Sequence, residues 1–362
     1  MKRLTILLLL AAAACGPSTR APTTPAVDQG PFSVILFIGD GTGLTYWSAA
    51  KLASSELAIE RFPVVGLVDT EASNSRITDS AAGATAYAAG VRTYNGAIGV
   101  DPDTAAVRTV LELARSQSMA TGLVATATVT HATPAAFAAH VPSRNMHWEI
   151  AAQLADAELD VLLGGGRRFF DGAERPDSVD LIERMARRAT VVESPDALAA
   201  LDPGAVTALV GLFAAENPGA ATERRPTLPQ LTDAAIRVLE RDPDGFFLMV
   251  EGSQIDWRGH DNAPLQEVVA EVQDFDMAIR QGLMFLQRRP NTLVLVVADH
   301  STGGLALHPD ERGVFGAHYT TEGHTAEMVP MFAIGPGAAA FAGIMDNDRV
   351  GRLLLQLVRE GG

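Results

Sequence analysis

The sequence of 362 residues lacks several features that would point to common classes of protein. Cys15 is the only cysteine, so no disulfide can form within the chain and the fold must be stable without one. Lys2 and Lys51 are the only lysines, and the formal net charge is −15. This balance argues against nucleic acid as a binding partner, because no basic patch is available to neutralise phosphates. The Gly-x-Ser-x-Gly pattern of the common serine hydrolases is also absent.

The first residues, MKRLTILLLLAAAACG, have the order of an export signal: two basic residues, an apolar run and small residues. The apolar run is too short to cross a bilayer as a permanent helix. We interpret 1–14 as a signal peptide, 15–30 as a flexible tether and 31–362 as the folded domain. Cys15, alone after the small residues, resembles the lipidation site of bacterial lipoproteins, which predicts a membrane anchor; ordinary signal cleavage is the alternative. Either route predicts an exported protein of the periplasm or cell envelope.

Short apolar runs recur along the chain with helical patterns between them. Because the runs do not alternate with polar residues, they predict strands buried on both faces, as in a parallel sheet. The fold class predicted is α/β, a three-layer α/β/α sandwich with a mostly parallel central sheet. The region 200–230 is the least regular, and we expect 219–230 to be a surface loop or part of the rim of a site. The predicted strands are 34–38, 121–126, 159–165, 246–250, 293–298 and 328–335, and the predicted helices are 149–157, 232–242 and 268–289.

Acidic residues follow three of the predicted strands. One such residue is usually a turn residue, but open α/β sheets bind their ligands beyond the carboxyl ends of the strands, where all three would meet. Asp256 and His260 are four residues apart, which places both on one face of a helical turn. The candidate ligands are Asp40, Glu251, Asp256, His260, Asp299, His300 and His324.

These candidates suit a metal centre. Carboxylate and imidazole ligands are typical of catalytic zinc, whereas an oxygen-only subset suits magnesium. So many acids brought together without cations would repel one another strongly. A pair of metal ions relieves that repulsion, and such pairs are common in phosphoryl-transfer sites.

Ser80 follows Asp79 at the start of a run of alanines and glycines that ends at Gly90. Asp79 or Thr78 can cap a helix there, with Gly90 as its stop. Ser80 then lies in the first helical turn, where free backbone N–H groups attract anions. A capping role without chemistry is the alternative for Ser80.

Six segments together resemble the alkaline phosphatase family: FIGDGTG, TDSAAGATAYAAGVRTYNGAIGVD, ATVTHATPAAFAAHVPSR, GFFLMVEGSQIDWRGH, VVADHSTGG and TEGHTAEMVPMFAIGPGA. They occur in the family's order from about residue 34 to 337. The resemblance implies that 31–362 is an alkaline phosphatase-like catalytic domain. It further implies a phosphomonoesterase that works through a phosphoserine, with two zinc ions and one magnesium ion per chain.

The resemblance also implies roles for individual residues. Ser80 would be the nucleophile, Arg144 would grip two phosphate oxygens and Asp79 would orient Arg144. Asp256, His260 and His324 would hold one zinc. Asp40, Asp299 and His300 would hold the other. The magnesium would be bound by Asp40, Thr133 and Glu251.

His131 and Trp257 depart from the best-known bacterial pattern, which has Asp and Lys at these positions near the third metal and the phosphate. The departure concerns the third metal, and not the class of reaction. His140 is expected to be structural, and His147, His308 and His318 to be surface or rim residues. A homodimer is a further expectation. The rival functions are a phosphodiesterase or sulfatase of the same superfamily and a phosphate-capturing lipoprotein without catalysis.

Overall fold

The computed structural model describes residues 30–202 and 205–361. The predicted signal peptide, Cys15 and nearly all of the predicted tether lie outside the described residues. Within the described ranges, no helix is both long and apolar enough to cross a membrane.

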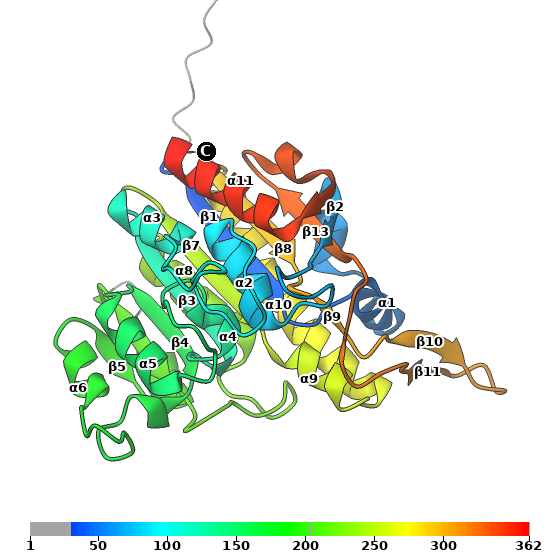
Figure 1. The fold of residues 1–362 in the computed structure, drawn as a ribbon, viewed down its shortest axis with the longest axis horizontal. Coiled ribbons are helices and arrows are strands. Elements are labelled where there is room, and N and C mark those ends of the chain that lie inside the picture. The colour runs from blue at the N-terminus through cyan, green and yellow to red at the C-terminus, as the bar shows by residue number, and fades with distance from the viewer. Residues whose placement is uncertain (1–29, 203–204, 362) are drawn as a thin grey trace, which may run out of the picture.

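A central sheet of ten strands forms the middle layer (Figure 1). Its order is β14-β2-β13-β8-β1-β7-β3-β4-β6-β5. Only β13 runs against its neighbours in this sheet, since it pairs antiparallel with both β2 and β8. The strands are β1 Ser33–Gly39, β2 Val64–Asp69, β3 Ala120–Thr128, β4 Val161–Gly165, β5 Thr190–Val192, β6 Leu209–Leu212, β7 Phe246–Gly252, β8 Thr292–Val297, β13 Val329–Ile334 and β14 Gly343–Asp346.

The sheet is mixed but mostly parallel, and both of its faces are covered by helices. Along β1, Val34 and Leu36 belong to one hydrophobic core, whereas Ile35 and Phe37 belong to the other. All four are fully buried, which is why the run shows no polar alternation. Helices α2, α3, α5 and α11 cover the near face in Figure 1, and α1, α8 and α10 cover the opposite face. The predicted three-layer α/β/α sandwich is therefore confirmed.

The helices begin and end where the local sequence favours it. Asp79 caps α2 by accepting a hydrogen bond from the Ala82 N–H at 3.0 Å, and Gly90 ends the helix in the left-handed conformation. The helices are α1 Leu44–Ala53, α2 Ser80–Ala89, α3 Val110–Ser116, α4 Ala132–Ala135, α5 His147–Asp156, α6 Leu181–Ala186, α7 Pro195–Ala200, α8 Leu228–Leu239, α9 Gln254–His260, α10 Leu265–Arg288 and α11 Asn347–Glu360.

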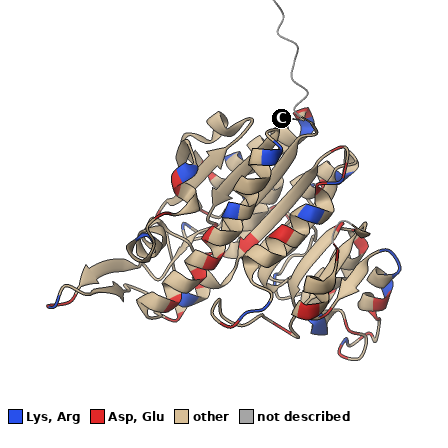
Figure 2. Ribbon diagram, turned by 180° about the vertical axis from the view of Figure 1, so that it is seen from behind, with Lys and Arg blue, Asp and Glu red and all other residues tan. Residues whose placement is uncertain are grey.

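Short elements complete the fold. Two small antiparallel sheets pair β10 with β11 and β9 with β12. Charged residues of both signs are spread over the ribbon, as Figure 2 shows from behind. The remaining elements are the strands β9 Ser301–Thr302, β10 Ala306–Pro309, β11 Phe315–His318 and β12 His324–Thr325, and the single 3₁₀ turns η1 Ala58–Arg61, η2 Arg167–Phe169 and η4 Ala338–Phe341.

The segment 219–230 is only in part the surface loop that the sequence predicts. Residues 219–227 lie outside helices and strands and several of them are exposed, but α8 begins at Leu228 and Arg224 is only 2% exposed. The Arg224 guanidinium donates hydrogen bonds to Glu271 and Asp274 on α10, at 2.6 and 3.0 Å. This buried ion pair fixes the segment against α10, a contact that sequence spacing does not reveal.

Candidate active site

The acids that follow the predicted strands lie together at one edge of the sheet. Strands β7, β1 and β8 are parallel neighbours, so Glu251, Asp40 and Asp299 at their carboxyl ends meet there. All three residues are completely buried. The structure therefore brings together the three acids as the sequence analysis predicted.

Histidines from other elements complete three groups of potential metal ligands. Asp40, Asp299 and His300 form the first group, and Asp256, His300 and His324 form the second. Asp40, His131 and Glu251 form the third. Within each group the ligand atoms lie within 4.8 Å of one another, which is close enough for one ion.

His260 lies beside the second group. Its Nε2 is 3.2 Å from Asp256 Oδ2 and 3.1 Å from His324 Nε2. The helical spacing in α9 thus brings Asp256 and His260 to one point, as expected. The hydrogen bond with Asp256 raises the pKa of His260 to about 9. The structure also brings His300 close to this group, because its ring stacks on that of His324 with centroids 3.6 Å apart.

The electrostatics of the cluster favour the binding of cations. Burial, with the neighbouring acids adding to it, raises the pKa of Asp40 well above its usual range. Burial likewise raises the pKa of Asp299 to about 8 and that of Glu251 to about 7. Within the described residues, both carboxylate oxygens of Asp40 lack a hydrogen-bond partner, as do Asp299 Oδ2 and Glu251 Oε1. Buried carboxylates with free oxygens are suited to cations.

Several residues that the sequence analysis did not single out hold these ligands in place. Thr302 donates a short hydrogen bond to Asp256 Oδ1 and contacts His300 Nδ1 at 3.2 Å. The Tyr46 hydroxyl donates to the Thr302 carbonyl at 2.7 Å. Thr302 lies two residues after His300, within the segment VVADHSTGG, and that proximity was the only available signal.

Two further contacts fix the carboxylates. The Gly41 N–H donates to Asp299 Oδ1 at 3.2 Å, and the Ser253 hydroxyl donates to Glu251 Oε2 at 2.6 Å. Gly41 has a φ of +67°, and a Cβ there would lie 2.7 Å from the Asp256 Cα. This turn needs glycine, both for its backbone conformation and for the close approach of α9.

Ser80 is the first residue of α2 and is 2% exposed. Its Oγ lies 3.3 Å from His300 Nε2, which places the hydroxyl beside the first ligand group. A Cβ on Gly83, one turn further on, would lie 3.1 Å from the Asp299 carbonyl oxygen. The small residues after Ser80 therefore allow α2 to pack close to the ligands.

Arg144 reaches the same site from the segment between α4 and α5. One guanidinium nitrogen donates to Asp79 Oδ2 at 3.0 Å, and the other lies 3.1 Å from His131 Nε2. Burial, and then the charge of Arg144, lowers the pKa of His131 to about 3. His131 is therefore neutral, and its Nε2 accepts the hydrogen bond from Arg144.

The other expected residues lie as follows. Thr133 is completely buried in α4, and its hydroxyl makes no hydrogen bond within the described residues. Trp257 packs edge-to-face on His131, with ring centroids 6.3 Å apart. His147 contacts the Thr130 hydroxyl at 3.0 Å and stacks on Phe169. His308 and His318 lie on the β10–β11 hairpin, away from the ligand groups.

Comparisons with known proteins agree with this geometry. The family model described as "Alkaline phosphatase" matches residues 33–318. Alkaline phosphatase 3 of Bacillus subtilis is 34% identical over 413 residues, covering 88% of this chain and 87% of that protein. The alkaline phosphatase of Escherichia coli K12 is 32% identical, covering 92% of this chain and 87% of its own length.

The solved structures lead to the same family. The alkaline phosphatase of the Antarctic bacterium TAB5 superposes with a TM-score of 0.85 at 37% identity, covering 91% of this chain and 98% of that one. A histidine-to-aspartate variant of that enzyme was solved with Mg bound in its M3 site. Because the match extends over most of the chain and includes both sequence and fold, this protein belongs to the alkaline phosphatase family and hydrolyses phosphate monoesters.

Proposed function

We propose that the hydrolysis proceeds through a covalent phosphoserine at Ser80, beside a centre of two zinc ions and one magnesium ion. The observation that carries this proposal is the position of Ser80 Oγ. It lies at the N-terminus of α2, 3.3 Å from His300 Nε2, and His300 joins the two ligand groups of Asp40 and Asp256. Ser80 is thus a buried hydroxyl at a helix N-terminus and lies beside the residue that the two ligand groups share.

The residues present fit the metals. Asp40, Asp299 and His300 would hold one zinc, and Asp256, His260 and His324 would hold the other. At the first of these sites, the unpaired buried oxygens of Asp40 and Asp299 would supply negative charge. When bound, the zinc ions would lower the pKa of the Ser80 hydroxyl and stabilise charge on the reacting oxygens.

The histidine that contacts Ser80 is a weak base. His300 Nε2 is the nearest ring nitrogen, but burial lowers the pKa of His300 well below its usual value. The same nitrogen faces Asp40 and Asp299, each at 3.4 Å, as a metal ligand would. A histidine with a strongly lowered pKa has little affinity for a proton and is a poor general base. This contact therefore supports activation of Ser80 by a metal ion and not by His300.

Arg144 is placed to bind the phosphoryl group. Its guanidinium is fixed on one side by Asp79 and on the other by His131, and its side chain is still 25% exposed. A planar guanidinium can donate to two non-bridging oxygens at once. Arg144 and the free N–H groups at the start of α2 would therefore orient the phosphorus above Ser80 Oγ.

The reaction then takes two displacements. In the first, the Ser80 hydroxyl gives up its proton to solvent and its oxygen forms a bond to phosphorus, while the bond from phosphorus to the ester oxygen breaks and the alcohol leaves with a proton from solvent. In the second, a water oxygen bonds to phosphorus, the Ser80 oxygen is released and takes back a proton, and inorganic phosphate departs. Arg144 keeps its two contacts through both steps, because the same oxygens remain on the phosphorus.

The third metal site depends on His131. Since His131 Nε2 accepts from Arg144, the proton of the neutral ring is on Nδ1, which faces Glu251 Oε1 at 4.0 Å. That tautomer offers no lone pair to a metal. The remaining ligands are the oxygens of Asp40, Thr133 and Glu251, a set that suits magnesium.

Export, acylation of Cys15 and a homodimer complete the proposal, and they rest on the sequence and the resemblance alone. If Cys15 carries lipid, the intact protein partitions into detergent and the Cys15→Ser variant does not, because the acyl chains provide the membrane affinity. Phase separation of cell envelopes measures this directly. Equal partitioning of the two proteins would remove the anchor from the proposal.

The metal-free protein should lose stability as the pH rises. Asp299 and Glu251 have folded-state pKa values of about 8 and about 7, above their ordinary values of 3.8 and 4.5. A carboxyl with a raised pKa stabilises the folded state at low pH, and this contribution disappears as pH rises through the folded pKa. After chelation, the melting temperature followed by circular dichroism should therefore fall between about pH 4.5 and 8, and zinc should restore it most at the alkaline end. A melting temperature that increases over this range would contradict the assignment.

Ser80→Ala should abolish the phosphoenzyme and reduce turnover by at least ~10³-fold, since the covalent step has no alternative nucleophile. Metal content should stay close to that of the wild type, because no proposed ligand is changed. Labelled phosphate trapped at acid pH and located by mass spectrometry is the measurement. The control is Ser48→Ala, which removes an exposed hydroxyl on α1. Label on any residue other than Ser80 in the wild type would refute the assignment.

Arg144→Ala tests the preference for monoesters over diesters. The wild type should favour an aryl phosphate monoester over the matched diester by at least ~10³ in kcat/KM, because the diester lacks one anionic oxygen for Arg144. The variant should retain some activity and show a smaller ratio. Arg76→Ala, an arginine whose side chain is 84% exposed, is the control. If the ratio of kcat/KM for monoester over diester is the same in Arg144→Ala as in the wild type, the role given to Arg144 is wrong. A wild-type preference for the diester would favour the phosphodiesterase alternative.

A further inference from the structure

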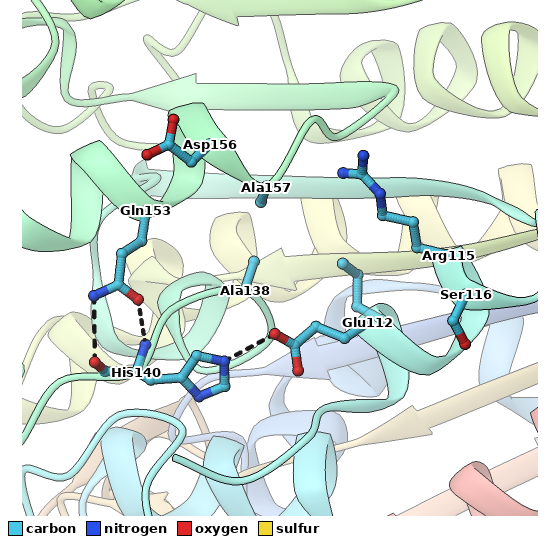
Figure 3. Close-up of a pocket in the computed structure, with 9 residues that line it drawn as sticks. Glu112, Arg115, Ser116, Ala138, His140, Gln153, Asp156 and Ala157 are labelled. Atoms are coloured by element: carbon cyan, nitrogen blue, oxygen red, sulfur yellow. Dashed lines mark hydrogen bonds and ion pairs between the residues drawn. The ribbon is translucent and has the colours of Figure 1, made fainter.

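A surface pocket of about 510 Å³ lies between α3 and α5 (Figure 3), and none of its lining residues belongs to the ligand groups. Its lining includes the Glu112, His140, Gln153 and Asp156 side chains. Figure 3 shows the His140 ring pointing toward Glu112, with Gln153 against the His140 backbone. The His140 side chain is 20% exposed, so protons from solvent can reach it.

His140 makes two ring contacts, and both are with acceptors. Its Nδ1 lies 2.6 Å from the Gly99 carbonyl oxygen, and its Nε2 lies 2.9 Å from Glu112 Oε1. A neutral imidazole carries only one N–H, so it can make only one of these hydrogen bonds. Both form only when His140 is a cation. The hydrogen bond with Glu112 raises the pKa of His140 despite partial burial, in line with this geometry.

The backbone of His140 is held as firmly as its ring. Gln153 of α5 accepts from the His140 N–H at 2.7 Å and donates to the His140 carbonyl at 3.2 Å. Glu112 is fixed in turn, because its other oxygen accepts from the Thr109 N–H at 2.9 Å in a capping box. His140 thus ties the segment 140–144 to α3, to α5 and to Gly99.

The segment 140–144 carries Arg144. The segment 96–99 contacts Asp79, the residue to which the Arg144 guanidinium donates. Ile98 and Val141 exchange two backbone hydrogen bonds, and the Arg144 N–H donates to the Gly96 carbonyl at 2.8 Å. The Gly96 N–H donates to Asp79 Oδ2 at 3.0 Å, the same oxygen that receives the Arg144 guanidinium. A shift of Gly99 relative to His140 would therefore move Asp79 and Arg144 relative to each other.

We propose that His140 and Glu112 are a positioning pair: protonated His140 locks the two segments that hold Arg144 and Asp79, and its deprotonation loosens phosphate binding at alkaline pH. The proposal rests on the proposed role of Arg144. The other charged groups at the pocket are Arg115 on α3, paired with Glu158, and Asp156 on α5, paired with Arg184. The Gly99 segment faces the ring with a carbonyl, so Glu112 is the charge that contacts His140 directly.

The direction of the pH effect follows from the raised pKa. The lock is complete below the ordinary pKa of histidine, 6.5, and is lost as the pH rises through the raised value. Above the raised pKa the ring is neutral, and one of its two nitrogens carries a lone pair. That nitrogen can no longer donate a hydrogen bond to its acceptor, which is either the Gly99 carbonyl or the Glu112 carboxylate. The lost hydrogen bond should weaken binding of inorganic phosphate by about three- to tenfold, the range that one hydrogen bond supports.

Glu112→Gln gives a sharp test. The amide oxygen can keep the capping box with Thr109, and the amide N–H₂ can donate to Nε2 of neutral His140 while Nδ1–H still donates to Gly99. We expect the variant to bind phosphate as the wild type does at neutral pH and more tightly than the wild type at alkaline pH. The measurement is the inhibition constant of phosphate for the variant divided by that for the wild type, at each pH. This ratio should be one at neutral pH and fall below one at alkaline pH, and a ratio that stays at one throughout would overturn the proposal.

His140→Gln should show the opposite pattern, with binding weakened about three- to tenfold at neutral pH and a ratio near one at alkaline pH, since the wild type has then lost the same hydrogen bond. Asp156→Asn is the matched control, because it removes a negative charge from the same pocket and leaves the contacts of His140 unchanged. The ratio of its inhibition constant to that of the wild type should stay at one at every pH. If Asp156→Asn instead shows the same pH dependence as Glu112→Gln, the effect comes from the net charge of the pocket and the proposal is wrong.

Histidine NMR separates this proposal from that for Arg144. The ring of His140, assigned by its loss in His140→Gln, should titrate above the ordinary histidine range in the wild type and at or below it in Glu112→Gln. A normal titration of His140 in the wild type would overturn the positioning pair even if Arg144 binds phosphate. If instead His140 titrates as expected but Arg144→Ala binds phosphate like the wild type, the role given to Arg144 has failed. Should His140→Gln not fold, single-site ¹⁵N labelling and Glu112→Gln still decide the matter.

Discussion

The repulsion among buried carboxylates at the carboxyl ends of β7, β1 and β8 is the constraint on which the site depends. Parallel pairing places Glu251, Asp40 and Asp299 side by side, and burial removes the water that would screen their charges. Protonation or cations can relieve that repulsion. The raised pKa values of Asp40 and Asp299 correspond to relief by protonation. The histidines gathered around the same point favour relief by cations.

The rest of the molecule keeps this unfavourable cluster together. The sheet has apolar cores on both faces, so the strands that carry the acids cannot separate without exposing them. Close backbone approaches at Gly41 and Gly83 bring α9 and α2 against the ligands. Hydrogen bonds from Thr302 and Ser253 then fix individual carboxylate oxygens. These contacts orient the ligand atoms toward one another, which is the arrangement that a bound ion needs.

The fold and much of the site could be predicted because their signals are local. Continuous apolar runs predicted the central strands β1, β3, β4, β7 and β8, and the acids directly after them predicted where the site lies. The antiparallel direction of β13 could not be predicted, since a run buried on both faces looks the same in either direction. The short strands β2, β5, β6 and β14 at or near the edges of the sheet were also missed, because they are brief or partly exposed.

Contacts between distant segments could not be predicted either. The hydrogen bond from Thr302 to Asp256 joins residues 46 positions apart, and neither residue's neighbours in sequence indicate it. His140 was expected to be structural, and its link to Arg144 becomes visible only when Gly99 and Glu112 are found on either side of its ring. The buried Arg224 in a segment expected to be a loop is a similar case. Each depends on tertiary packing, which a local pattern does not encode.

The most direct test of the account is the metal content of the active enzyme. Elemental analysis of protein purified without chelators, together with activity towards an aryl phosphate monoester, should give about two zinc ions per chain. Removal of the metal should abolish turnover, and zinc with magnesium should restore it. Full activity in protein that retains less than about one equivalent of any divalent metal after exhaustive chelation would contradict the account, because the buried carboxylates would then serve catalysis without the cations that their arrangement requires.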